Sequence, residues 1–140
     1  MEKYLFVCHQ NRQRSPFAEQ WLSKKFREKG IQSYVKSAGI SVPDKGIQLT
    51  QELVDWADRI FFMEEYMVER IKGKYERLEG KIEVLNIPCN FDIEIEDNTE
   101  IKRMNAREAL EYFYKDPTHI DIGGDLMDKL LEAKLKYLFE

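Results

Sequence analysis

A cysteine and an arginine near the N-terminus have residue types and a spacing that could carry out phosphate chemistry. Five residues separate Cys8 from Arg14, and Ser15 and Pro16 follow directly. A thiolate is a strong nucleophile, and a guanidinium can donate two hydrogen bonds to one phosphate group. The backbone N–H groups of a loop that leads into a helix add positive potential. The segment from Cys8 to Ser15 is therefore predicted to be a phosphate-binding loop with Cys8 as its nucleophile.

The flanking sequence predicts the elements that hold this loop. Residues 4–7 form a short apolar run that is typical of a strand buried on both faces, and this strand ends at Cys8. Ser15 and Pro16 favour a helix start, with Ser15 as N-cap, and Gly30 favours its end. The loop thus lies between a strand end and a helix N-terminus. The positive potential at the helix N-terminus should favour the thiolate form of Cys8 over the thiol. The Ser15 hydroxyl could also donate a hydrogen bond to the sulfur.

The rest of the chain alternates between strands and helices. Further strands are expected at residues 33–36, 60–63 and 81–87, and helices at about 15–29, 50–57, 64–75, 99–115 and 125–137. This order predicts an α/β fold: an open, doubly wound, four-stranded parallel sheet of order 2-1-3-4 with helices on both faces. Ligands bind such sheets at the carboxyl ends of strands where the strand order reverses, and Cys8 occupies that position.

Several stretches between these elements are predicted to be loops or breaks. Residues 37–46 are expected to form a loop, and the charged stretch 93–102 a solvated lid or loop. Gly123 and Gly124 are expected to break the chain before a last helix that Asp125 caps. Because no repeat or linker interrupts the chain, residues 1–140 are predicted to form a single domain.

Composition limits the possible function classes. The chain has 140 residues and a net charge of −4, which does not favour nucleic-acid binding. No apolar run approaches the roughly 20 residues that span a bilayer, so no membrane partner is expected, and the predicted location is the cytoplasm. Two cysteines do not make a disulfide framework, and neither His9 nor His119 has a metal-ligand spacing with them. No metal site is expected.

The loop resembles a known family. Residues 8–16 are similar to the C-x5-R-S-P signature of low-molecular-weight protein tyrosine phosphatases. Asn11 matches the asparagine that braces the loop in this family. Residues 37–39, Ser-Ala-Gly, and residues 57–64 resemble the family's segments after its second strand and around its third. The resemblance extends from residue 3 to about residue 88 and, less closely, to the last helix.

The resemblance implies a mechanism without a cofactor. Cys8 would attack phosphorus and form a cysteinyl-phosphate, while Arg14 and the loop amides hold the phosphate oxygens. Ser15 would assist the thiolate. The intervening loop residues would line the substrate site; they are His9, Gln10, Asn11, Arg12 and Gln13. The partners would be a phosphorylated protein or a small phosphate ester, with inorganic phosphate released.

An aspartate is also required as general acid and then general base. Asp116, followed by Pro117, lies before the last helix as the family's acid does. Thr118-His119 stands where the resemblance would place aromatic residues. Asp92 and Asp97 in the acidic stretch are alternatives for the same role.

Two other functions remain open. A thiol-dependent arsenate reductase on the same fold would need a resolving thiol, for which Cys89 is the candidate because Gln13 replaces the second loop cysteine of many family members. A non-catalytic phosphate-binding module would keep Arg14 and the loop without a working acid. Phosphotyrosine, phosphoarginine and small phosphate esters would all fit the loop.

Overall fold

The computed structural model describes residues 2–11, 14–43, 45–87, 93–97, 100–104 and 122–139, and their side chains except at 93–97, 100–104 and 122–126. The chain divides into two compact units. The N-terminal unit comprises residues 1–85 together with Phe139, and the C-terminal unit comprises residues 86–138. Each unit is described by itself below, and the single domain stays a prediction.

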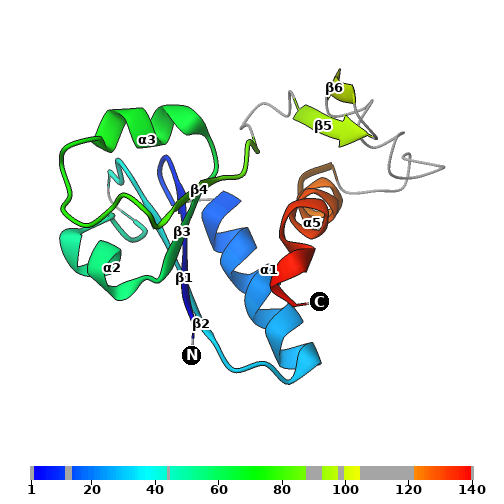
Figure 1. The fold of residues 1–140 in the computed structure, drawn as a ribbon, viewed down its shortest axis with the longest axis horizontal. Helices are drawn as coiled ribbons and strands as arrows, with labels where there is room; N and C mark the ends of the chain where they lie inside the picture. The colour runs from blue at the N-terminus through cyan, green and yellow to red at the C-terminus, as the bar shows by residue number, and fades with distance from the viewer. Residues whose placement is uncertain are drawn as a thin grey trace. The chain divides into compact units, whose positions relative to one another are not determined.

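Four parallel strands form the sheet of the N-terminal unit, in the order β2-β1-β3-β4 (Figure 1). They are β1 (Lys3–Cys8), β2 (Tyr34–Gly39), β3 (Arg59–Phe62) and β4 (Ile82–Val84). Strand β1 is internal: it pairs with β2 along its whole length and with β3 from Tyr4 to Val7. The predicted strand order 2-1-3-4 is confirmed.

Helices cover both faces of this sheet, as predicted. They are α1 (Arg14–Lys29), α2 (Gln51–Trp56) and α3 (Glu65–Ile71). Figure 1 shows α1 on one face and α2 and α3 on the other. The buried residues of α1 recur every three or four positions, at Ala18, Trp21, Leu22 and Phe26, which makes one apolar stripe toward the sheet.

The internal strand holds Cys8 rigidly. Every β1 residue from Tyr4 to Cys8 is buried, and the rings of Phe6 and Phe61 stack at 5.2 Å between β1 and β3. Side chains on both faces of β1 pack against neighbours, so its carboxyl end has little freedom to move.

Four boundaries differ from the sequence-based expectations. Strand β4 ends at Val84 rather than at residue 87, because its partner β3 ends at Phe62, opposite Val84. Ser37-Ala38-Gly39, expected in a loop, completes β2, because β1 continues far enough to pair Cys8 with Gly39. Helix α3 ends at Ile71 rather than near residue 75; Gly73 follows with φ +83°, which cannot continue a right-handed helix. Ser15 lies within α1 rather than at its N-cap, because the helix begins at Arg14.

In the C-terminal unit, the stretch expected to be a loop forms an antiparallel hairpin. Strands β5 (Ile93–Asp97) and β6 (Glu100–Met104) pair with Glu94 opposite Arg103. Isoleucine and glutamate alternate from residue 93 to 96, which is the period of a strand, and the charges obscured this signal. The predictions of a loop at 93–102 and of helix at 100–104 are therefore wrong.

Helix α5 (Ile122–Leu135) begins earlier than expected. Gly123 and Gly124 lie in its first turn, so the predicted break there and the cap at Asp125 are wrong. The N–H groups in the first turn of any helix lack intrahelical partners. Glycines at these positions therefore do not break the hydrogen bonds that run along the rest of α5.

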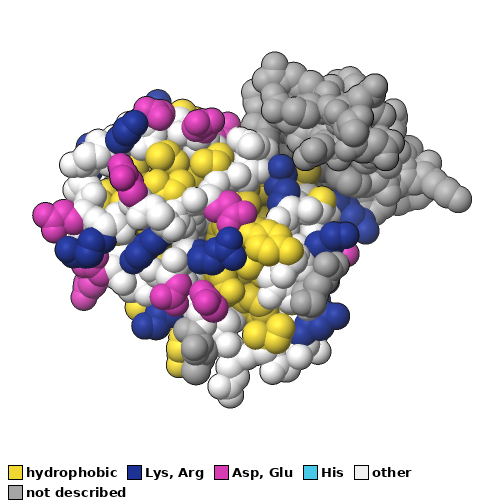
Figure 2. Space-filling model, in the orientation of Figure 1, with side chains coloured by type: hydrophobic (Ala, Val, Ile, Leu, Met, Phe, Trp, Pro, Cys, Tyr) yellow, Lys and Arg dark blue, Asp and Glu magenta, His cyan; other side chains and the backbone are white. Residues whose placement is uncertain are grey.

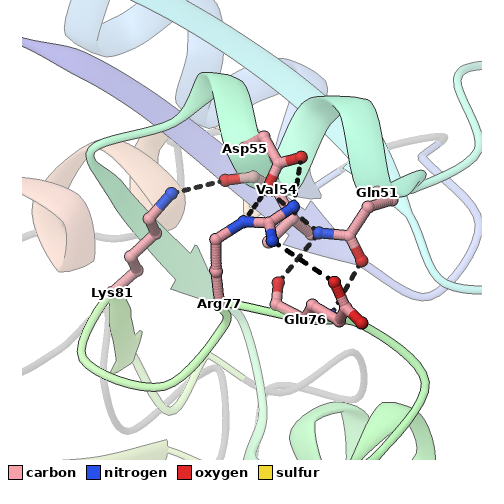
Figure 3. A network of polar contacts seen from close by, with 6 residues as sticks. All are labelled: Gln51, Val54, Asp55, Glu76, Arg77 and Lys81. Atoms are coloured by element: carbon pink, nitrogen blue, oxygen red, sulfur yellow. Dashed lines mark hydrogen bonds and ion pairs between the residues drawn. The ribbon is translucent and has the colours of Figure 1, made fainter.

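A network of exposed polar side chains ties α2 to the segment before β4 (Figure 3). The Gln51 amide donates to the Glu76 carbonyl and accepts from the Glu76 N–H, both at 2.8 Å. Arg77 Nε and Nη2 donate to the two Asp55 carboxylate oxygens, both at 2.9 Å. These four residues, Gln51, Asp55, Glu76 and Arg77, are called the α2 surface network below.

The surface of the N-terminal unit mixes both signs of charge. Figure 2 shows acidic and basic side chains interspersed on the left of the view, over α2 and α3. Among the helices that the structure describes, none combines the length and apolar character needed to cross a bilayer.

Candidate active site

Cys8 is the last residue of β1 and lies at the carboxyl edge of the sheet. The end of β1 is bonded on both sides. Cys8 pairs with Gly39 of β2, and the N–H of Met63, which follows β3, donates to the Val7 carbonyl at 2.9 Å. The edge between β1 and β3 is where the strand order reverses, so Cys8 occupies the position at which such sheets bind ligands. The side chain is buried, and the thiol is free.

Two groups from the described part of the loop and of α1 contact the sulfur. The Asn11 N–H donates to Cys8 Sγ at 3.1 Å, and Ser15 Oγ lies 2.9 Å from Sγ. Ser15 is in the first turn of α1, so the sulfur also lies near the positive end of that helix. A thiolate can only accept, and both neighbours can donate to it, so this surrounding suits the ionised nucleophile.

Ser15 has a single proton and two acceptors for it. Its hydroxyl lies 3.2 Å from the Ala38 carbonyl oxygen and 2.9 Å from Cys8 Sγ. With a neutral thiol, the S–H can donate to Ser15 Oγ while the hydroxyl donates to Ala38. Alternatively, the hydroxyl can turn and donate to Cys8 Sγ. The Ser15 hydroxyl can therefore serve either the sulfur or the Ala38 carbonyl.

The Asn11 side chain holds the loop in shape. Its amide nitrogen donates to Ser15 Oγ at 2.9 Å and to Ser37 Oγ at 3.0 Å, and its oxygen accepts from the Ile47 N–H at 2.9 Å. Asn11 has φ +56°, a left-handed conformation that asparagine tolerates better than most residues. Cys8, Asn11, Ser15 and Ser37 are all buried, and these four are called the sulfur network below.

Gly39 allows the loop to approach β2 closely. A Cβ atom there would lie 2.7 Å from the Asn11 nitrogen and 2.9 Å from the Gln10 carbonyl carbon. Both distances are shorter than real Cβ contacts, and both neighbours are backbone. The Ser-Ala-Gly segment stands out in the sequence by its resemblance to the family, but only this contact shows why its last residue has no room for a side chain.

Arg14 is held by a residue that the sequence did not suggest. Its Nη1 donates to Glu64 Oε2 at 2.8 Å. The Arg14 side chain is 11% exposed and that of Glu64 25%, so the ion pair is partly shielded from water. A charge-assisted bond in such a setting restricts the guanidinium to few orientations.

His9 follows the nucleophile, and its ring centroid lies 6.2 Å from that of Tyr66. Its Nδ1 atom is buried and has no hydrogen-bond partner among the residues that the structure describes. His9, Gln10 and Asn11 precede α1, and Arg14 and Ser15 begin it, so the structure places these predicted site residues around one strand end.

The remaining predicted residues cannot be located in the same way. Arg12, Gln13, Cys89, Asp92, Asp116 and His119 lie outside the described residues. Asp97 ends β5 in the C-terminal unit, and its side chain is not described. The general acid and the resolving thiol therefore stay predictions. Among the residues that the structure describes, no group of three or more His, Cys, Asp or Glu side chains could hold a metal ion.

A family of known proteins matches the N-terminal part of the chain. The family model described as low molecular weight phosphotyrosine protein phosphatase matches residues 3–59, which include β1, the loop, α1 and β2. A search of curated protein sequences gives no match.

Several solved structures share the fold. A mutant of YwlE from Bacillus subtilis is 22% identical over the whole of both chains, with a TM-score of 0.68. The solution structure of a low molecular weight protein tyrosine phosphatase from Bacillus subtilis is 21% identical, covering 96% of this chain and 97% of the other, with a TM-score of 0.61. The tyrosine phosphatase Wzb from Escherichia coli K30, in complex with phosphate, is 20% identical, covering 98% of this chain and 95% of the other, with a TM-score of 0.60. The resemblance is confirmed: residues 3–59 match the low-molecular-weight phosphotyrosine protein phosphatases in sequence, and the chain has the fold of these enzymes.

Proposed function

We propose that this protein is a phosphatase that hydrolyses phosphate monoesters through a cysteinyl-phosphate intermediate on Cys8. The family match and the structural neighbours both support phosphatase activity. The observation that carries the mechanism is the surrounding of the sulfur. Cys8 Sγ is within hydrogen-bond reach of the Asn11 N–H and of Ser15 Oγ, in the same loop as Arg14.

In the first step, Cys8 Sγ attacks phosphorus. An S–P bond forms, the ester P–O bond breaks, and the leaving oxygen takes a proton from the general acid. The Ser15 hydroxyl, no longer needed by the sulfur, can return to the Ala38 carbonyl. Arg14 and the loop N–H groups hold the oxygens of the transferring phosphoryl group, whose charge is spread over them.

In the second step, water attacks the phosphorus of the cysteinyl-phosphate. The residue that donated its proton now removes one from the water, the S–P bond breaks, and inorganic phosphate leaves. Sulfur departs as a thiolate, and the Asn11 N–H and the Ser15 hydroxyl stabilise it by donating to it. No metal or cofactor is needed for these steps.

We assign the acid and base role to Asp116, with Asp92 and Asp97 as the alternatives. The substrates that we propose are phosphorylated proteins or small phosphate esters. One similar structure is described as the YwlE arginine phosphatase, so phosphoarginine belongs in the substrate panel beside phosphotyrosine. A reduced nucleophile is essential to this mechanism, which agrees with the predicted cytoplasmic location.

The test is hydrolysis of p-nitrophenyl phosphate and phosphotyrosine between about pH 5 and pH 8. Cys8→Ser should lower turnover by at least about 10⁴-fold. Asp116→Asn should slow phosphotyrosine more than p-nitrophenyl phosphate, because p-nitrophenolate needs less help to leave. If Asp92→Asn or Asp97→Asn shows this loss of turnover and Asp116→Asn does not, the general acid is the residue whose substitution causes the loss. No turnover by the wild type would contradict the phosphatase assignment.

A further inference from the structure

The first turn of α3 contacts the loop at two points. Glu64, the residue before α3, bonds Arg14 at the end of the loop, and Tyr66 lies against His9 at its beginning. This follows from the sheet, because β3 ends beside β1 and α3 starts directly beyond it. The start of α3 therefore borders the place where a phosphate ester would approach Cys8.

Among the tyrosines that the structure describes, Tyr66 is distinguished by being exposed close to the nucleophile. The side chain is 38% exposed, although its ring contacts His9, the residue that follows Cys8. The two rings are 6.2 Å apart and inclined at 42°, a tilted arrangement typical of aromatic pairs. Tyr66 therefore presents an exposed aromatic surface beside the residue that follows Cys8.

The ring is also held in place. The Arg70 guanidinium carbon lies 5.0 Å from the centroid of the Tyr66 ring, one turn further along α3. The contacts with His9 and Arg70 restrict the rotamers of Tyr66. The entropy cost of packing a ligand against the ring is therefore small. A restrained aromatic side chain makes a more effective binding surface than a mobile one.

We propose that Tyr66 is a specificity-determining residue that packs against the aromatic ring of an aryl phosphate held over Cys8. This deepens the proposed function and rests on it. Tyr66 would act on the leaving group, because the contact that the structure describes between Tyr66 and the loop is an aromatic one, with His9. It should therefore favour aryl phosphates over small non-aromatic phosphates.

Steady-state kinetics with phosphotyrosine and acetyl phosphate test this assignment. Tyr66→Ala should raise KM for phosphotyrosine by about threefold to tenfold, the range expected for one lost aromatic contact. The KM for acetyl phosphate and the inhibition by inorganic phosphate should stay within about twofold of wild type. Tyr66→Phe should behave like the wild type. Tyr34→Ala, at the opposite end of the strands and 53% exposed, is the matched control and should change neither substrate.

Two results would overturn the proposal. One is an unchanged KM for phosphotyrosine in a folded Tyr66→Ala protein. The other is an equal rise for acetyl phosphate, which would mean that Tyr66 only supports the loop. If the wild type turns over neither compound, the proposed function fails, and calorimetric binding then tests the contact between Tyr66 and the aromatic ring separately. Tyr66→Ala should weaken phosphotyrosine binding and leave inorganic phosphate binding unchanged, and an equal effect on both ligands would contradict the role of Tyr66.

Discussion

Two polar networks in the N-terminal unit contrast in nearly every physical respect. The sulfur network joins the buried side chains of Cys8, Asn11, Ser15 and Ser37 by hydrogen bonds and contains no carboxylate or guanidinium. The α2 surface network joins exposed residues, and its bidentate ion pair between Asp55 and Arg77 is 41% and 60% exposed (Figure 3). The two networks show that the number and charge of contacts do not indicate where function lies.

Burial explains the difference. A buried polar group that loses its partner keeps its desolvation cost, about 1–3 kcal/mol, whereas an exposed group finds water. Exposed ion pairs contribute little to stability because solvent and salt screen them. Substitutions in the sulfur network should therefore affect both folding and activity, and substitutions in the α2 surface network should affect neither strongly.

The largest effect is expected for Asn11→Ala. This change leaves Ser37 Oγ and the Ile47 N–H without their partner and places alanine at φ +56°. The free energy of unfolding should fall by about 2–4 kcal/mol, and kcat/KM for p-nitrophenyl phosphate should fall by about 100-fold. Urea denaturation and steady-state kinetics measure the two effects. Full activity in a folded variant would contradict the role given to Asn11.

Gly39→Ala should come next. Its Cβ would lie 2.7 Å from the Asn11 nitrogen, so the loop must shift to admit it. Overpacking of this kind costs about 1–3 kcal/mol, and a displaced loop should lower kcat/KM by about tenfold or more. Gly80→Ala is a control for an added methyl group, because nothing lies within 4 Å of that position, although its φ of +89° adds local strain. It should lower stability without changing activity in the folded protein.

Glu64→Gln tests the partner of Arg14. The carboxylate is lost but the side-chain size is kept, so Arg14 should be less well oriented and kcat should fall by about tenfold. Thermal stability should fall slightly, because glutamine can still accept a hydrogen bond from the largely buried Arg14 but no longer carries a charge. Glu65→Gln, the exposed neighbour on α3, should leave kcat unchanged. Equal kcat values in both variants would show that Glu64 does not position Arg14.

The smallest effect is expected in the α2 surface network. The hydrogen bonds from Arg77 hold the pKa of Asp55 below its usual range. Because the pKa of Asp55 is lower in the folded state than in the unfolded state, its ionised form stabilises the fold at pH values above the ordinary aspartate pKa. This stabilisation is lost as the pH falls from the ordinary aspartate pKa through the lowered pKa of the folded state. Asp55→Asn should therefore lose less stability than the wild type on acidification, with activity unchanged. Melting temperatures at a series of acidic pH values measure this, and identical pH profiles would refute the linkage.

The sequence predicts local features well and distant contacts poorly. Strand β1, the loop and α1 follow from an apolar run, the spacing of Cys8 and Arg14, and a helical stripe within one short stretch. Glu64 could not be identified in this way, because it lies 50 residues from Arg14 and only the sheet brings them together. The need for Gly39 likewise arises from a tertiary contact.

The hairpin of β5 and β6 teaches a different point. Its alternating isoleucines and glutamates were visible in the sequence, but a high density of charge suggested a solvated loop. A strand needs only one apolar face, so charge at every second position is compatible with it. Periodicity was the better guide than composition in this stretch.

The central claim is that Cys8 carries the phosphoryl group during turnover. The most direct measurement mixes wild-type protein with phosphotyrosine, quenches with acid within the first turnovers, and locates the phosphoryl group by peptide mass spectrometry. The mechanism predicts a phosphoryl group on Cys8 that is absent in Cys8→Ala. Turnover without phosphorylation of Cys8, or with the phosphoryl group on another residue, would contradict it.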